Sequence, residues 1–361
     1  MKKEKVVVGM SGGVDSSVAA YLLKQEGYDV IGVTMQIWQD KDTENLEDTG
    51  CCGLSAVDDA RRVAEALEIP HYVMNFKKEF SENVIDYFAQ EYMLGRTPNP
   101  CIACNRYVKW EALLKRSLDI GADYIATGHY AQIVKLDNGR YSLKKSATIE
   151  KDQTYALYSL TQNQLARTLM PVGKYSKPEI REIAEKINLR IANKPDSQEI
   201  CFIPDDDYGK FLREYTQKSF EPGDFISTNG KVLGKHRGII YYTIGQRKGL
   251  GLNLGKPGYV VEINLEKNQV VIGDNDEVFA KGFYAENINL MSLEKIEDEI
   301  ELEVKIRYNH QPAKGRIRYV DKDKVECIFE ERQRAITPGQ AAVFYQDDIV
   351  AGGGTIIKSI L

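Results

Sequence analysis

The first residues suited to chemistry are those of the segment SGGVDSS, residues 11–17. The segment follows the apolar run KVVVGM and precedes a stretch with helical spacing, which predicts a strand, a tight loop and a helix start. Backbone amides and hydroxyl donors at the positive end of a helix bind phosphate, and glycines let the backbone approach an anion closely. The segment therefore predicts a phosphate-binding loop.

The type of this loop narrows the ligand. It lacks the Gly-Lys-Ser/Thr ending of a Walker A site and the G-x-G-x-x-G spacing of dinucleotide folds. It resembles the PP-loop of the ATP pyrophosphatases, which release pyrophosphate while attaching AMP to a substrate. The resemblance implies ATP with Mg²⁺ as the bound nucleotide, and Asp15 could orient a metal-bound phosphate.

Cysteine is the second residue type that could do chemistry here. Cys101 and Cys104 lie in RTPNPCIACN, and Cys201 lies in DSQEICFIP. The reactive form of cysteine is the thiolate, so a catalytic site must lower a thiol pKa of about 8.5. The neighbouring candidates for this task are Arg96, Arg106 and Lys109.

Six segments together resemble the tRNA-specific 2-thiouridylases: SGGVDSS, GRTPNPC..CN, ATGHYA, KDQTYAL, DSQEICFIP and YTIGQRKGLG. That family replaces oxygen by sulfur at carbon 2 of the wobble uridine in tRNA. The resemblance implies that AMP is first transferred to the base oxygen, which turns a poor leaving group into a good one. It also implies tRNA as substrate and a cysteine desulfurase or a sulfur-relay protein as sulfur donor.

Two routes for the sulfur stay open. The resemblance implies that Cys201 carries sulfur as a persulfide and that Cys104 is the nucleophile, with a disulfide between them to be reduced afterwards. Many family members have aspartate where this chain has Cys101. The three thiolates of Cys101, Cys104 and Cys201 could instead hold a [4Fe-4S] cluster with one iron open to sulfide. A different PP-loop synthetase, or a non-catalytic RNA-binding protein, are rival functions.

The resemblance also implies the binding residues. Met35 and Gly128 end predicted strands at the edge where such sheets bind ligands, and Tyr308 offers a stacking face within a basic stretch, KIRYNHQPAKGRIR. The implied ATP-binding residues are Gly9, Met10, Ser11, Gly12, Gly13, Val14, Asp15, Ser16, Met35 and Gly128. The residues implied to contact the target base and the tRNA are Asn99, Pro100, Cys101, His129, Lys151, Asp152, Gln153, Arg307, Tyr308 and Gln340.

Three further observations concern the remaining cysteines. Cys51 and Cys52 precede a helix in a glycine-flanked loop and are interpreted as residues that line the site without a catalytic role. Cys327 lies inside a predicted strand and is expected in a core. Six cysteines in 361 residues do not form a disulfide scaffold, which favours a reducing compartment.

The elements that must position these residues alternate between strand and helix in the first half. This order favours α/β architecture with a doubly wound parallel sheet of the ATP pyrophosphatase type. A hairpin is expected at Asn138-Gly139. The predicted strands are residues 5–10, 29–35, 71–75 and 124–127, and the predicted helices are residues 16–25, a segment from Ser55, and residues 178–187.

From about Lys218 short strands separated by glycine turns follow one another, and from Glu301 they are typical of a small β-barrel. We expect a catalytic PP-loop domain over residues 1–210, a central β-rich tRNA-binding domain over 211–277, and a C-terminal β-barrel over 278–361.

Composition limits the remaining possibilities. The chain is 43% hydrophobic and 28% charged, as is ordinary for a globular protein, and no apolar stretch is long enough to span a bilayer. We therefore expect a cytoplasmic protein with no membrane contact. The formal net charge of −5 gives no global positive field, so an RNA would have to be bound by a local basic surface.

Overall fold

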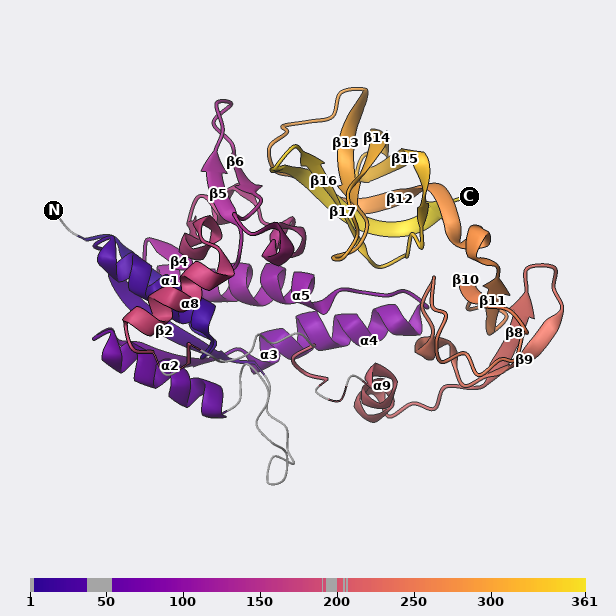
Figure 1. Ribbon diagram of the computed structural model, residues 1–361, viewed down its shortest axis with the longest axis horizontal. Helices are drawn as coiled ribbons and strands as arrows, with labels where there is room; N and C mark the ends of the chain where they lie inside the picture. The colour runs from indigo at the N-terminus through magenta and orange to yellow at the C-terminus, as the bar shows by residue number, and fades with distance from the viewer. Residues whose placement is uncertain (1–2, 38–53, 190, 193–199, 204, 206) are drawn as a thin grey trace. The chain divides into compact units, whose positions relative to one another are not determined.

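The computed structural model (Figure 1) describes residues 3–37, 54–189, 191–192, 200–203, 205 and 207–361. Cys51 and Cys52 lie outside these residues. The chain forms two compact units, which are described separately. The first comprises Met1–Ile85, Cys101–Asp206 and Asp348–Val350, and the second comprises Asp86–Pro100, Asp207–Asp347 and Ala351–Leu361.

The first unit is built on a five-stranded sheet in the order β3-β2-β1-β4-β7. Each neighbouring pair is parallel, so the carboxyl ends of all five strands lie at one edge. The strands are β1 (Lys5–Gly9), β2 (Asp29–Gln36), β3 (His71–Asn75), β4 (Tyr124–Ala126) and β7 (Thr168–Leu169). The predicted parallel sheet is confirmed.

Three helices of this unit share one hydrophobic core with β1: α1 (Val14–Gln25), α2 (Leu54–Ala66) and α8 (Lys177–Lys186). Figure 1 shows α1 and α8 next to each other, and they contribute Val18 and Ile180 to this core. The helix predicted from residue 16 begins two residues earlier, because Gly13 is extended and acts as its N-cap. The Ser176 and Glu179 side chains form a capping box that starts α8.

A continuous helical segment contains Cys101 and Cys104. It consists of α5 (Pro100–Ala103), a π-helical stretch η2 (Cys104–Leu113) and α6 (Leu114–Asp119). The predicted hairpin is confirmed as the antiparallel pair β5 (Gln132–Lys135) and β6 (Tyr141–Lys144), and Gly139 takes the positive φ of 81° that its turn requires. The other short elements are α3 (Lys77–Phe80), η1 (Ser81–Ile85), η3 (Ile149–Lys151), η4 (Thr154–Leu157), α7 (Gln162–Leu165) and η5 (Pro171–Lys174).

The second unit contains two helices, a four-stranded sheet and a barrel. The helices α4 (Asp86–Met93) and α9 (Tyr208–Thr216) meet through Phe88 and Phe211, whose ring centroids are 6.5 Å apart. The sheet has the order β10-β11-β8-β9. Its strands are β8 (Gly223–Ser227), β9 (Val232–His236), β10 (Tyr259–Asn264) and β11 (Gln269–Gly273), and the 3-10 helix η6 (Ile239–Tyr241) lies between β9 and β10 in the chain.

The barrel follows η7 (Asn275–Val278) and has the strand order β12-β15-β14-β13-β16-β17, closed by pairing of β12 with β17. Closure removes the exposed sheet edges, and the interior is filled by side chains such as Phe283, Ile317 and Phe344. Cys327 lies in this core, as predicted. The strands are β12 (Phe279–Leu290), β13 (Glu299–Lys305), β14 (Ala313–Asp321), β15 (Lys324–Arg334), β16 (Ala341–Gln346) and β17 (Ile349–Ile360).

Candidate active site

The phosphate loop is braced by its own serines. The Ser16 hydroxyl accepts a hydrogen bond from the Ser11 amide at 3.2 Å and donates to the Gly13 carbonyl at 3.2 Å. Ser17 is fully buried and donates to the same carbonyl at 2.8 Å. Ser11 is exposed, so its hydroxyl stays accessible while Ser16 and Ser17 fix the loop at the start of α1. This is the strand–loop–helix arrangement that binds phosphate.

Two glycines permit close packing around this loop. Gly12 has a φ of +68°, and a Cβ built on it would lie 2.3 Å from the Ala56 carbonyl oxygen. Gly128 follows β4, and a Cβ there would lie 2.5 Å from the Ser16 amide nitrogen. No other residue type fits at either position without moving backbone. Gly128, in the motif ATGHYA, is therefore part of the wall of the phosphate loop.

The sheet edge brings several of the implied ATP residues together. Gly9 ends β1 and Gly128 follows the neighbouring β4, so both lie at the carboxyl edge of the sheet. Met35 lies near the end of β2, on the other side of β1, and is half-buried. Met10 is buried, and its amide donates to the Val33 carbonyl at 2.8 Å. The structure thus places Gly9, Met35 and Gly128 at the edge where doubly wound sheets bind nucleotides.

The Asp15 carboxylate is already paired within the protein. Lys177 Nζ lies 2.8 Å from one oxygen and 2.9 Å from the other, and the Tyr130 hydroxyl donates to the first oxygen at 2.7 Å. Lys177 is only 7% exposed. These contacts hold both carboxylate oxygens in place within the first unit.

His129 lies in a second polar cluster after β4. Its Nδ1 is 2.7 Å from the Thr127 hydroxyl, its Nε2 is 3.4 Å from Lys109 Nζ, and its ring packs beside Trp110 at 5.5 Å between centroids. Burial, and secondly the charge of Lys109, lower the pKa of His129 well below its usual value. The imidazole is therefore neutral at neutral pH. Lys109 also donates to the Asn105 side-chain oxygen at 2.9 Å.

The three described cysteines of this unit lie at or near its surface. Cys101 and Cys201 are exposed, and Cys104 is partly buried one turn after Cys101. The π-helical stretch that begins at Cys104 is of a kind that recurs at functional sites. Phe202, the neighbour of Cys201, is buried and packs edge-on against Phe80 at 5.7 Å between ring centroids. This contact anchors the segment that carries Cys201.

An iron–sulfur cluster would need its three thiolates gathered around one point. Across the part of the chain that the structure describes, which includes Cys101, Cys104 and Cys201, no three His, Cys, Asp or Glu side chains form a group that could hold a metal ion. The three cysteines in this arrangement do not fit a cluster.

The segment before Cys101 belongs to the second unit and is bound there by the barrel. The Thr97 amide donates to the Pro338 carbonyl at 2.9 Å, and the Gln340 side chain donates to the Thr97 carbonyl at 2.7 Å. The Thr97 hydroxyl is 3.0 Å from that of Thr243 in the central part of the unit. Asn99 and Pro100 follow directly in the chain. Gln340, implied to contact tRNA, thus also fixes the segment implied to face the target base.

The basic stretch of the barrel is less basic in three dimensions than in sequence. Arg307 donates to the Arg334 carbonyl at 2.8 Å, and Tyr308 is 38% exposed with Lys305 Nζ 5.7 Å from its ring centroid. Three other cations form ion pairs with carboxylates of neighbouring strands. These pairs are Lys314–Glu301, Arg316–Glu299 and Arg318–Glu326.

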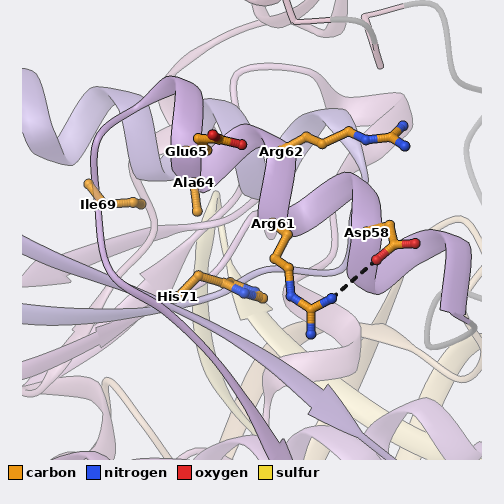
Figure 2. A pocket seen from close by; sticks show the side chains of 7 residues that line it. All are labelled: Asp58, Arg61, Arg62, Ala64, Glu65, Ile69 and His71. Atoms are coloured by element: carbon orange, nitrogen blue, oxygen red, sulfur yellow. Dashed lines mark hydrogen bonds and ion pairs between the residues drawn. The ribbon is translucent and has the colours of Figure 1, made fainter.

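A shallow pocket of about 490 Å³ lies between α2 and the start of β3 (Figure 2). Figure 2 shows Arg61 directed toward Asp58, with which it forms an ion pair, and lying near His71. His71 Nε2 is 2.9 Å from the Thr34 hydroxyl, which donates to the Met10 carbonyl. Burial, with a smaller effect of Arg61, lowers the pKa of His71. The pocket contains none of the sequence-predicted residues.

Comparison with known proteins covers almost the whole chain. Family models match in succession: a tRNA methyl transferase HUP domain over residues 4–205, a tRNA methyl transferase PRC-barrel domain over 209–274, and an aminomethyltransferase beta-barrel domain over 280–356. The tRNA-specific 2-thiouridylase MnmA of Lachnoclostridium phytofermentans is 67% identical over 98% of this chain and 100% of that protein. The MnmA proteins of Clostridium perfringens and Clostridioides difficile are 58% and 55% identical, over at least 99% of each chain.

The chain belongs to the tRNA-specific 2-thiouridylase family. The family expected from the sequence motifs is confirmed, and so is the fold class of a parallel α/β sheet followed by β-rich parts and a barrel. ATP use follows from this family together with the phosphate loop. In the described ranges no helix is long and apolar enough to cross a bilayer.

The family segment KDQTYAL shows how an implied substrate contact can have an internal partner. Asp152 is buried, and its carboxylate accepts hydrogen bonds from the Ser146 amide at 3.0 Å and the Thr154 hydroxyl at 2.5 Å. Gln153 exchanges hydrogen bonds with the Tyr130 backbone, both at 2.9 Å. Asp152 and Gln153 therefore shape the chain beside the loop, and Lys151 is half-buried at the end of η3.

Sequence reasoning missed Lys177 and Tyr130, the two partners of Asp15. Tyr130 lies in the motif ATGHYA, but the sequence does not indicate its hydrogen bond to Asp15. Lys177 precedes a proline at the start of α8 and lies 162 residues from Asp15 in the chain. No local pattern distinguishes it from the exposed lysines around it.

Proposed function

We propose that this protein thiolates carbon 2 of the wobble uridine in tRNA, with ATP consumed to activate the base oxygen. The observation that carries the proposal is one structural unit that contains both a glycine-walled phosphate loop and the Cys101–Cys104 helix start, along with Cys201. An adenylating enzyme with a small substrate needs the loop but no pair of accessible cysteines. The descriptions of two matching family models include the words methyl transferase, but transfer of a methyl group does not require a triphosphate-binding loop.

The proposed reaction has two stages, adenylation of the base oxygen and transfer of sulfur. The uracil O2 attacks the α-phosphorus of ATP, pyrophosphate leaves, and carbon 2 becomes bonded to an O–AMP leaving group. The terminal sulfur of a Cys201 persulfide then attacks carbon 2, and Cys104 attacks the inner sulfur. A Cys104–Cys201 disulfide forms, AMP leaves with the former base oxygen, and the base keeps the sulfur as a thiocarbonyl. An external dithiol reduces the disulfide for the next turnover.

The chain's own groups contribute binding and positioning. The amides at residues 11–16 and the exposed Ser11 hydroxyl bind the phosphates. A neutral His129, with Lys109 beside it, faces the base without adding a positive charge of its own. Mg²⁺ bound with ATP would offset the negative charge of the triphosphate, and Lys177 and Tyr130 hold the Asp15 carboxylate at the loop.

The tRNA and the sulfur donor are the proposed partners. We assign the catalytic part to residues 1–210, tRNA binding to residues 211–277, and further tRNA contacts to the barrel of residues 278–361. Arg307, Tyr308 and Gln340 are the proposed contacts of the barrel, and Asn99, Pro100 and Cys101 face the flipped base. A cysteine desulfurase or a sulfur-relay protein supplies the persulfide, and the reaction takes place in the cytoplasm.

The proposal is tested by single-turnover assays with unmodified tRNA, ATP and a persulfide donor. Pyrophosphate release and 2-thiouridine are measured for the wild-type, Cys104→Ser and Cys201→Ser proteins. We expect both variants to release pyrophosphate while forming at least a hundredfold less 2-thiouridine. Cys327→Ala, in the barrel core, is the matched control and should thiolate normally. Thiolation at the wild-type rate by either serine variant would refute the assigned sulfur chemistry.

A further inference from the structure

The phosphate loop contains a negative charge that would oppose its proposed ligand. Asp15 is the second residue of α1, next to the amides that bind phosphate. A carboxylate in this position repels a polyphosphate unless its charge is compensated. Compensation comes from α8, where the Lys177 ammonium lies within 2.9 Å of both Asp15 oxygens.

The packing and capping of α8 fix the backbone position of Lys177. Lys177 is the first residue of α8, whose start is fixed by the Ser176–Glu179 capping box. The helices α1 and α8 pack in one core, and the Lys177 side chain is 9% exposed. Burying an ammonium group is costly, and the Asp15 carboxylate compensates that cost with two hydrogen bonds. The Asp15 carboxylate, whose side chain is 28% exposed, thus offsets part of the cost of burying the Lys177 ammonium.

Tyr130 connects this pair to the segment that closes the loop. Its hydroxyl donates to Asp15 at 2.7 Å, and the Lys177 ammonium lies 5.7 Å from its ring centroid. Gly128, two residues earlier, contacts the backbone at Asp15 and Ser16. The carboxylate is thus fixed from α8 on one side and from the segment after β4 on the other.

We propose that Lys177 is a positioning residue of the ATP site, which neutralises and orients Asp15 so that the loop presents its amides to the triphosphate without a competing negative charge. The proposal deepens the proposed function, on whose ATP binding it rests. Two other roles would give different results. Lys177 could bind a phosphate directly, or Asp15 could be a ligand of Mg²⁺.

The experiment measures the Kd for Mg·ATP by calorimetry in four full-length proteins: wild type, Asp15→Asn, Lys177→Met and the double variant. Lys177→Met leaves Asp15 uncompensated, so binding should weaken about tenfold or more, as expected for a bare charge near a polyphosphate. Asp15→Asn leaves the Lys177 ammonium uncompensated and should bind Mg·ATP more tightly than wild type. In the double variant, which has neither charge, the affinity should return to within about twofold of wild type.

Lys186→Met, on the same helix, is the matched control, since it removes an exposed cation and its ion pair with Glu182 at the same change in net charge. It should bind ATP normally. Thermal unfolding of each variant reports whether it is folded. If Lys177→Met fails to fold, the comparison of the double variant with wild type still decides.

Three outcomes would overturn the proposal. A double variant that binds as weakly as Lys177→Met would mean that Lys177 acts on the nucleotide itself. A tenfold loss caused by Asp15→Asn alone would mean that the carboxylate binds the metal–nucleotide complex. Unchanged affinity of a folded Lys177→Met protein would mean that compensation is unnecessary. If wild type itself binds no ATP, the proposed function fails instead.

Discussion

Gly128→Ala tests the wall of the phosphate loop. The added methyl group would lie 2.5 Å from the Ser16 amide nitrogen and 2.6 Å from the Asp15 carbonyl carbon, so the loop and the segment after β4 must separate by roughly 1 Å to restore ordinary contact. A displacement of this size in a binding constellation costs about a hundredfold. We expect the Kd for ATP to rise by about that factor, and tRNA-dependent pyrophosphate release to fall in proportion at low ATP.

The assay must separate this effect from general destabilisation, since overpacking costs about 1 to 3 kcal/mol of folding free energy. Gly121→Ala is the matched control. Gly121 has a φ of +78° in the same unit, and an added Cβ meets nothing within 4 Å. It should lose about 1 kcal/mol of stability and bind ATP normally. If a folded Gly128→Ala protein binds ATP within twofold of wild type, the inferred loop geometry is wrong.

Two further predictions concern the second unit. Gly339 has a φ of +90°, and a Cβ there would lie 2.9 Å from the Thr97 amide nitrogen. Gly339→Ala should therefore displace the segment before Cys101 and slow thiolation about tenfold, with ATP binding unchanged. Gly255→Ala is the control, because Gly255 has a φ of +69° and open space around it, and equal thiolation rates for the two variants would contradict this role of the barrel. Burial, with smaller effects of Arg307 and Lys305, lowers the pKa of His310 to about 4. Because the unfolded chain takes up this proton below pH 6.5, stability should fall by about 1 to 3 kcal/mol between pH 6.5 and 4. His310→Gln should flatten that part of the urea-unfolding profile, and an unchanged slope would show that His310 is not responsible.

The sheet was predictable because its determinants are local. Apolar strands that alternate with segments of helical spacing indicate a parallel sheet, and the glycines of SGGVDSS indicate the phosphate loop between β1 and α1. The helix predicted over residues 178–187 begins one residue earlier, at Lys177, where the Ser176–Glu179 capping box starts it. Element ends differ by one or two residues because hydrogen bonding from neighbouring segments decides them.

The parts of the site that the sequence does not predict depend on contacts between segments far apart in the chain. The Asp15–Lys177 pair joins residues 162 apart, and its formation depends on how α1 and α8 pack. The sequence of the barrel's basic stretch does not show its ion pairs, because Glu299, Glu301 and Glu326 lie in other strands and one strand's sequence does not reveal its register. Likewise, the Gln340–Thr97 hydrogen bond links residues 243 apart.

The most direct test of the central claim follows the oxygen atom. A tRNA whose wobble uridine carries ¹⁸O at position 2 is thiolated in a single turnover, and the AMP product is analysed by mass spectrometry. If the base oxygen is adenylated before sulfur displaces it, each AMP released with 2-thiouridine contains one ¹⁸O. Formation of 2-thiouridine with unlabelled AMP would contradict the account.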